Sequence, residues 1–136
     1  MTTEKTLVLL KPDAVARGLV GTILARYEAK GLTLAAMDLR TCDADTADRH
    51  YAEHVAQPWY PALRSFITGA PLVALVLEGE RAVEAVRALN GATDSVAAVP
   101  GSIRGDLSLS KSENLVHASD SVASAGREIS IWFPHL

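Results

Sequence analysis

Apolar and polar positions alternate along the chain in a pattern that predicts four strands separated by helices. Apolar runs predict strands at residues 6–10, which should be buried, and 72–77, loose alternation predicts a second strand over residues 33–40, and residues 115–117 are expected to form the last strand. A spacing of three or four residues between apolar positions predicts helices elsewhere. These helices are expected over residues 19–30, before Gly31; from a cap at Asp43 or Asp45 to about His54; and over residues 62–68, 80–90 and 121–128.

The predicted order is strand, helix, strand, helices, strand, helix, long loop, strand and helix. Two split β-α-β units in this order predict a ferredoxin-like βαββαβ fold, an α+β sandwich in which helices cover an antiparallel four-stranded sheet. The long loop is expected over residues 92–113. Loops beyond about 12–15 residues are usually functional or disordered. Because this loop carries Thr93, Arg104 and Asp106 between glycines and prolines, we expect a functional one.

Composition narrows the classes of protein that the chain can represent. Its 136 residues are expected to form one domain, residues 1–136, and its net charge of −3 with no Lys/Arg run disfavours a nucleic-acid binder. No apolar run reaches the roughly 20 residues of a membrane span, and the amino terminus lacks a secretory signal pattern. The single Cys42 fits a reducing compartment. These features predict a cytoplasmic protein, and a few convergent cations could still bind a small anion.

His117 is the first candidate for chemistry, because it follows an apolar pair and precedes Ser-Asp-Ser, a cluster able to cap a helix. A histidine beside an apolar pair is more often structural. Here, however, Asn114, Ser119 and Asp120 bring polar groups to the same point, and Glu128 follows about two helical turns into the next segment. A carboxylate bonded to one ring nitrogen would fix the tautomer and leave the other nitrogen free to attack an electrophile.

Three cations from separate predicted elements form the second candidate set. Lys11 ends the first strand, Arg87 lies on a helix, and Arg104 stands near glycines that permit close backbone approach. Any one of them alone is more simply a solvated surface charge. Together they would suit a polyphosphate, because phosphoryl transfer depends on positioning and on stabilising charge on the moving group.

Two further features have competing interpretations. His50 and His54 are four residues apart and could share a helical face as zinc ligands do, but Glu53 is not where a His-Glu-x-x-His metalloprotease needs it. Trp59, bracketed by prolines, is either a core anchor or a stacking platform for a base. Composition and spacing alone therefore reach an α/β domain with a candidate anion site near His117.

From about residue 6 to residue 133 the chain also resembles the nucleoside diphosphate kinase family. The shared landmarks are Lys-Pro-Asp at 11–13, Arg-Gly-Leu-Val-Gly at 17–21, His-Tyr-Ala-Glu-His at 50–54, Gly-Ala-Thr at 91–93, Pro-Gly-Ser-Ile-Arg-Gly-Asp at 100–106 and Asn-Leu-Val-His-Ala-Ser-Asp-Ser at 114–121. No single motif is specific, but the set is specific in this order and spacing. The resemblance implies a ferredoxin-like core and transfer of the γ-phosphoryl group from a nucleoside triphosphate, mainly ATP, to nucleoside diphosphates.

The resemblance further implies a ping-pong route through a phosphohistidine on His117, with Glu128 as its orienting partner. It implies broad base specificity, Mg²⁺ held mainly by the nucleotide phosphates without direct protein ligands, and a homo-oligomer, a hexamer rather than a tetramer. The binding residues that it implies are Lys11, Arg87, Thr93 and Arg104 for the phosphates, Tyr51 close to them, Asn114 for the sugar or bridging phosphate, and Trp59 and Leu63 for the base.

Three departures from the family pattern stand out. Ala118 replaces a usual glycine, so we expect strain on the order of 1 kcal/mol from positive φ there. Gly126 interrupts the last predicted helix, and residues 107–113 are serine-rich. A nucleotide-binding relative with low turnover, acting through a protein partner, is the alternative function. The presence of Lys11, Arg87, Arg104, His117 and Glu128 favours the kinase.

Overall fold

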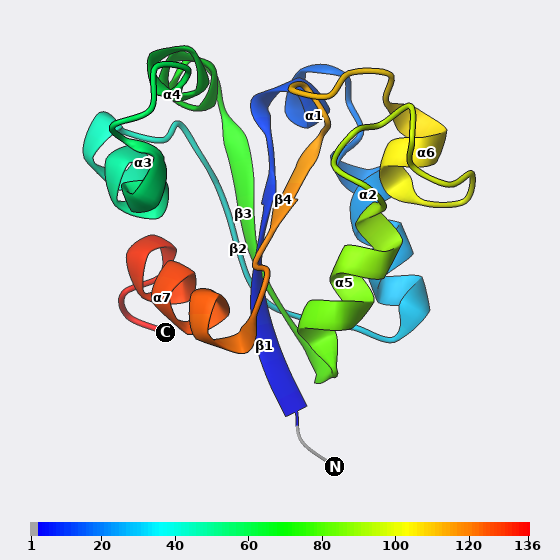
Figure 1. Cartoon of the computed structure of the whole chain (residues 1–136). Coiled ribbons are helices and arrows are strands. Elements are labelled where there is room, and N and C mark those ends of the chain that lie inside the picture. Colours follow the sequence, from blue (N-terminus) through cyan, green and yellow to red (C-terminus); the bar gives the residue numbers. More distant parts are fainter. Residues whose placement is uncertain (1–2) are drawn as a thin grey trace.

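The structure, a computed structural model, describes residues 3–136 (Figure 1). Two layers of helices enclose one sheet. The elements, in chain order, are β1 (Thr3–Leu10), α1 (Pro12–Ala16), α2 (Val20–Lys30), β2 (Thr33–Arg40), α3 (Ala44–His50), a short 3-10 helix (Ala52–His54), α4 (Tyr60–Thr68), β3 (Leu72–Glu80), α5 (Ala82–Asn90), α6 (Ile103–Leu107), β4 (Val116–Ala118) and α7 (Val122–Trp132).

The four strands form one sheet in the order β2-β3-β1-β4, and every neighbouring pair is antiparallel. This arrangement confirms the predicted ferredoxin-like α+β sandwich. In the central strand β1, Leu9 pairs with Ala74 of β3 on one side and with His117 of β4 on the other. The register therefore places the candidate histidine beside the end of β1, next to Lys11.

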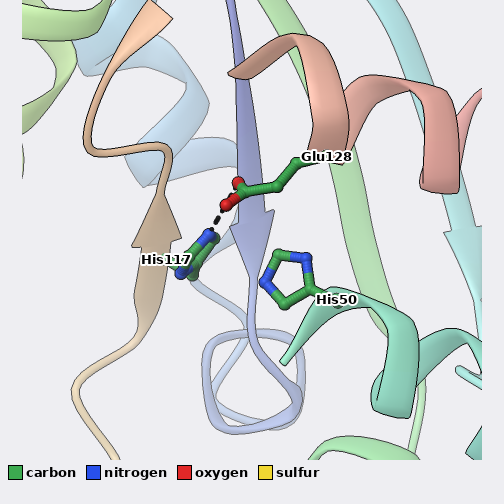
Figure 2. A group of neighbouring side chains, drawn as sticks. All are labelled: His50, His117 and Glu128. Carbon is green, nitrogen blue, oxygen red and sulfur yellow. Dashed lines mark hydrogen bonds and ion pairs between the residues drawn. The ribbon is translucent and has the colours of Figure 1, made fainter. Parts of the chain in front are cut away.

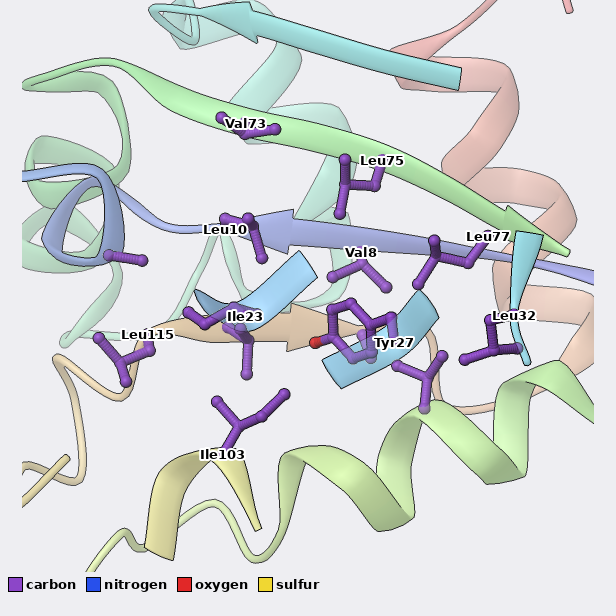
Figure 3. Close-up of a cluster of buried hydrophobic side chains, with 14 of the residues drawn as sticks. Val8, Leu10, Ile23, Tyr27, Leu32, Val73, Leu75, Leu77, Ile103 and Leu115 are labelled. Carbon is purple, nitrogen blue, oxygen red and sulfur yellow. The ribbon is translucent and has the colours of Figure 1, made fainter. Parts of the chain in front are cut away.

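The alternation of side chains along β1 divides the apolar residues between two cores. Val8 and Leu10 belong to the larger cluster, which lies under α2, α5 and α6 (Figure 3). Leu7 and Leu9 point to the opposite face, where α3, α4 and α7 cover them and Trp132 is buried. Both faces of the sheet are thus packed, which makes β1 a rigid support for the residues at its end.

Several boundaries differ from those predicted. Residues 12–16 form a helix instead of a simple turn, since Pro12 suits the first helical position. The helix expected to reach His54 ends at His50 and is followed by the 3-10 turn. The predicted loop 92–113 contains α6, whose cap Ser102 accepts a hydrogen bond from Gly105 N at 3.0 Å. Helix α7 continues beyond residue 128, because Ile129 and Trp132 extend its buried face.

The expectation of positive φ at Ala118 is wrong. Ala118 lies in β4, pairs with Val8 and is 9% exposed. Among residues 3–136, the non-glycine residues with positive φ are Arg81 and Leu115, at 51° and 75°. The strain therefore lies three residues earlier, where β4 begins.

Because Ala118 is an unstrained strand residue, Ala118→Gly is expected to give no gain in stability. Glycine in a strand has more freedom to lose on folding, so the free energy of unfolding should fall by about 0.5–1 kcal/mol. Urea denaturation of the two proteins measures this difference. A more stable glycine variant would contradict the extended geometry of residue 118.

Candidate active site

All the predicted site residues line one cleft of 1410 Å³. The cleft runs between the α3–α4 side of the molecule and the loops that surround β4 and α5. The predicted residues that it brings together are Lys11, Tyr51, Trp59, Leu63, Arg87, Thr93, Arg104, Asn114, His117 and Glu128. They come from separate helices, strands and loops along the chain, so their convergence is a property of the fold.

His117 and Glu128 form a hydrogen-bonded pair at the floor of the cleft (Figure 2). His117 Nε2 is 3.0 Å from Glu128 Oε1, and the Ser119 hydroxyl donates to the same oxygen at 2.8 Å. Glu128 and Ser119 are buried, whereas the His117 side chain keeps 25% of its surface exposed. Because the carboxylate accepts from Nε2–H, Nδ1 retains a free lone pair.

Local structure explains how this pair forms. Strand β4 is held by its pairing with β1, which fixes the backbone of His117. Helix α7 then begins at its cap Ser121, whose hydroxyl accepts from Ser124 N at 3.0 Å. The buried face of α7 carries Glu128 back over the strand to His117. The predicted strand-to-helix junction and cap are therefore confirmed.

Lys11 and Asn114 form a second hydrogen-bonded pair in the cleft. Lys11 Nζ donates to Asn114 Oδ1 at 2.7 Å and to the Ser112 carbonyl at 3.0 Å. The Asn114 amide in turn donates to the Thr93 carbonyl at 2.9 Å. Asn114 is 4% exposed, so in this structure its side chain orients Lys11 and joins two loops. Burial lowers the pKa of Lys11 from 10.5 to about 8.

That lowered pKa predicts a pH-dependent affinity for nucleotide. Only protonated Lys11 attracts a phosphate, and with a pKa of about 8 the charged fraction drops from about nine-tenths at pH 7 to about one-tenth at pH 9. The Kd for ADP, measured by calorimetry, should rise about tenfold over this interval. Lys11→Arg should remove the dependence, because arginine stays charged. A wild-type Kd that is flat from pH 7 to 9 would argue against this role.

The two arginines of the cleft have different surroundings. Arg104 is 9% exposed, and its guanidinium donates to the carbonyls of Gly91, Asn114 and Val116 at 2.8, 3.2 and 2.6 Å. Burial lowers its pKa. Arg87 lies exposed on α5 and lines the cleft. Arg104 thus braces the loops around His117, while Arg87 is free to reorient toward a ligand.

Asp13 supports the site although its chemistry was not predicted. Leu115 N donates to Asp13 Oδ2 at 3.0 Å, and Lys11 N donates to the Leu115 carbonyl at 2.8 Å. These two bonds hold Leu115 at its positive φ of 75° and so fix the backbone between Asn114 and His117. A leucine gives no sequence signal for positive φ, so only the structure reveals this clamp.

The opposite wall of the cleft is aromatic. Trp59 is 50% exposed, and its ring centroid lies 5.1 Å from that of His54. Leu63 and Phe66 line the same wall, and Lys11 Nζ lies 5.7 Å from the Phe66 ring centroid. Burial raises the pKa of Tyr51, which keeps its hydroxyl protonated. The exposure of Trp59 favours the stacking platform over the core anchor.

One group of potential metal ligands occurs among residues 3–136, and it contains His50, His117 and Glu128. His54 is not part of it, because α3 ends at His50 and the two histidines lie on different elements. His50 Nδ1 accepts a hydrogen bond from Trp132 Nε1 at 3.0 Å. In a neutral imidazole the other nitrogen then carries the proton and has no lone pair for a metal, so we interpret the group as a hydrogen-bonding network.

None of the described helices is long and apolar enough to cross a bilayer.

Comparisons with known proteins identify the family of the chain. The family model for nucleoside diphosphate kinase matches residues 4–136. A nucleoside diphosphate kinase of Nocardioides sp. is 70% identical over 132 residues, which cover 97% of this chain and 98% of the relative. The corresponding protein of Rhodococcus jostii is 66% identical over 135 residues, with 98% of this chain and 97% of the relative covered.

Solved structures give the same result. The halophilic nucleoside diphosphate kinase of Halobacterium salinarum, solved in complex with CDP, superimposes with a TM-score of 0.94 and 44% identity over 97% of this chain and 88% of that one. A family protein of Babesia bovis gives a TM-score of 0.93 and 42% identity, with coverage of 96% and 88%. This chain therefore belongs to the nucleoside diphosphate kinase family, and it is an enzyme that transfers phosphoryl groups between nucleotides.

Proposed function

We propose that His117 Nδ1 attacks the γ-phosphorus of a bound nucleoside triphosphate, mainly ATP, and is the group that carries the phosphoryl between substrates. An N–P bond forms, and the P–O bond to the leaving diphosphate breaks with its electron pair on that oxygen. A second diphosphate then attacks the phosphohistidine in reverse, which is a ping-pong sequence. The observation that supports this role is the His117–Glu128–Ser119 chain, which holds Nε2 and leaves Nδ1 free in the cleft.

Glu128 is the orienting partner in this scheme. Its carboxylate balances the positive charge that develops on the imidazole as Nδ1 forms its bond to phosphorus. Lys11, Arg87, Thr93 and Arg104 are proposed to bind the phosphates, with Tyr51 beside them, because all five line the cleft. Asn114, which accepts a hydrogen bond from Lys11, is proposed to contact the sugar or bridging phosphate.

The family requires a divalent metal, and we propose Mg²⁺ held mainly by the nucleotide phosphates. Glu53, Glu113 and Asp120 are cleft carboxylates able to offer oxygen ligands, and within residues 3–136 none of them joins a cluster of three potential ligands. This sparse donor set fits Mg²⁺, which keeps several waters and binds through few carboxylates plus substrate phosphates. When bound, the ion would neutralise charge on the triphosphate.

Incubation with γ-labelled ATP tests the covalent intermediate. The protein should retain label that is lost in acid and stable in base, as expected for a phosphorus–nitrogen bond, and adding unlabelled GDP should release it as GTP. Mass spectrometry of the labelled peptide should locate the phosphate on His117. Transfer to GDP without any protein-bound label would overturn the ping-pong proposal.

Broad base specificity is expected from the aromatic wall. Trp59 and Leu63 offer a flat face and apolar bulk, and stacking tolerates every base. Strong discrimination needs buried polar groups matched to one base edge, and Gln57, beyond Pro58, is exposed. The kcat/KM values for ADP, GDP, CDP, UDP and dTDP as acceptors should lie within about a hundredfold. A larger preference would point to a polar contact that this wall does not explain.

We further propose a hexameric assembly and a cytoplasmic location. The edge strand β2 exposes Met37 and Leu39, at 48% and 63%, which would be covered in an oligomer. The buried free thiol of Cys42 suits a reducing compartment. Light scattering coupled to size-exclusion chromatography distinguishes six subunits from four.

A further inference from the structure

His50 is a buried imidazole beside the reaction centre to which the proposed mechanism gives no role. It ends α3 and is 3% exposed. Its Nδ1 accepts from Trp132 Nε1 at 3.0 Å, so the proton of the neutral ring is on Nε2. Burial lowers the pKa of His50 to about 2, with the nearby His117 acting in the same direction. His50 is therefore neutral and in a single tautomer near neutral pH.

This fixed ring lies directly against His117. The two ring centroids are 4.5 Å apart, with an angle of 77° between the ring planes. Figure 2 shows one nitrogen of His50 turned toward His117. Because Nδ1 faces Trp132, the edge that meets His117 is the one that carries Nε2–H. Tyr51 is farther away, with its ring centroid 6.4 Å from that of His117.

We propose that His50 is a positioning residue for His117: its ring, held by Trp132, forms the wall that keeps the His117 imidazole turned so that Nδ1 faces the phosphoryl group. This role rests on the proposed function of His117. One hydrogen bond, to Glu128, leaves an imidazole free to pivot about that contact, and a rigid ring packed against it restricts the pivot. A neutral wall also avoids placing a like charge beside a ring that becomes positive during transfer.

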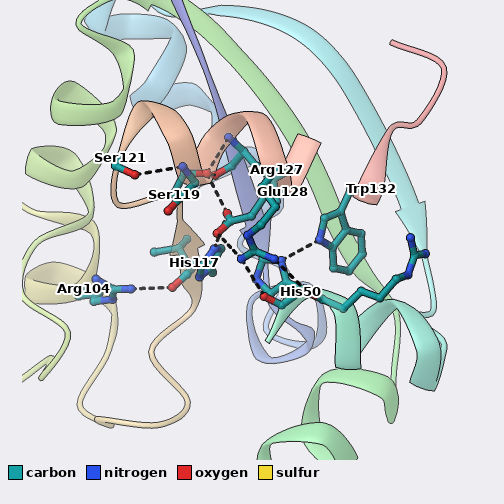
Figure 4. Close-up of polar contacts among 12 residues, drawn as sticks. His50, Arg104, His117, Ser119, Ser121, Arg127, Glu128 and Trp132 are labelled. Atoms are coloured by element: carbon teal, nitrogen blue, oxygen red, sulfur yellow. Dashed lines mark hydrogen bonds and ion pairs between the residues drawn. The ribbon is translucent and has the colours of Figure 1, made fainter. Parts of the chain in front are cut away.

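Helix α7 couples the two histidines, as Figure 4 illustrates. Glu128 of this helix holds His117, and Trp132, one turn further on, holds His50. Arg127 adds hydrogen bonds to the backbone carbonyls of Arg49 and His50 at 3.0 and 3.2 Å, which secure the end of α3. The C-terminal helix thereby sets the orientation of the nucleophile through both of its neighbours.

His50→Asn removes the ring that packs against His117 but keeps an acceptor for the hydrogen bond from Trp132. The asparagine side-chain oxygen can still accept from Trp132, but the ring is lost. We expect kcat to fall at least tenfold while the KM for both nucleotides changes less than threefold, because the phosphate and base residues remain in place. His135→Asn is the matched control, since His135 is exposed and outside the cleft. Full kcat in a folded His50→Asn protein would overturn the proposal.

Nitrogen NMR of the histidine rings provides a test that needs no variant of His50. In the resting wild-type enzyme, the His50 signals should show protonated Nε2 and unprotonated Nδ1 without change from pH 8 to pH 5. In Trp132→Phe, which keeps the aromatic bulk, the two tautomers should mix and kcat should fall at least threefold. An Nδ1–H tautomer in the wild type would show that Trp132 does not hold the His50 ring as proposed. So would a Trp132→Phe enzyme with wild-type kcat and an unchanged tautomer.

Failure of the proposed phosphohistidine gives a different result. In that case the wild type itself carries no label from ATP, whatever residue 50 is. If His117 carries label in the wild type, His50→Asn should form the same base-stable label at least tenfold more slowly in single-turnover mixing. Wild-type labelling rates in the variant would contradict positioning by His50 while leaving the role of His117 intact.

Discussion

His117→Ala should remove protein-bound phosphate and lower kcat by a factor of about 1,000 or more, because no other group can replace an attacking nitrogen held by Glu128. The fold should survive the change, since the His117 side chain lines the cleft and is partly exposed, while its neighbours in β4 are buried. Glu128 keeps its bond from Ser119, so the loss in unfolding free energy should be about 1 kcal/mol.

Labelling with γ-labelled ATP and a coupled transfer assay measure the two effects, and circular dichroism checks the fold. His135→Ala is the control, because it removes an exposed histidine outside the cleft. Label that persists in His117→Ala and moves to His50 or His54 would mean that the nucleophile has been assigned to the wrong residue.

Replacing the two arginines with alanine should produce different kinds of loss. Both changes should lower kcat at least tenfold, about 1.4 kcal/mol, because guanidinium groups stabilise the charge on the phosphoryl oxygens during transfer. Arg104→Ala should also lower the free energy of unfolding by about 2–4 kcal/mol, since it leaves the carbonyls of Gly91, Asn114 and Val116 without their shared donor. Arg87→Ala should leave stability within about 0.5 kcal/mol, as is usual for exposed positions.

Steady-state kinetics and urea denaturation, run on the same preparations, separate the two effects. Arg26→Ala is a useful reference, because Arg26 also bonds a loop carbonyl, that of Gly101, but lies outside the cleft. If Arg104→Ala lowers the free energy of unfolding no more than Arg87→Ala does, the hydrogen bonds from Arg104 to the three carbonyls do not stabilise the fold. If either variant keeps the wild-type kcat and only binds nucleotide more weakly, the arginine that it lacks does not stabilise the transition state.

Much of this architecture follows from local sequence. The apolar runs in β1 and β3 identify buried strands, because both faces of the sheet are covered by helices. The order of elements then leads to a ferredoxin-like sandwich. The residues around His117 predict a strand, a cap and a helix that returns a carboxylate, and the structure has all three.

The features that the sequence did not predict depend on contacts between distant segments of the chain. Helix α7 passes residue 128 because Trp132 finds a partner in His50 and a place in the core, neither of which its own segment specifies. Helix α6 lies inside a predicted loop, and its Arg104 donates to the backbone carbonyls of Gly91, Asn114 and Val116 in other segments. The family pattern suggested strain at Ala118, whereas the clamp from Asp13 puts positive φ at Leu115.

The sequence by itself thus determined which residues can perform the chemistry, since residue type fixes charge, proton affinity and hydrogen-bonding capacity. The tertiary structure alone decided which of them act directly and which hold others in place. Asn114 orients Lys11, and Arg104 braces the loops. His50, for which the spacing to His54 offered only a disfavoured zinc role, packs against His117 as a neutral ring. Such roles depend on burial and on contacts between distant segments, because these set the tautomer of a ring and the pKa of a buried group.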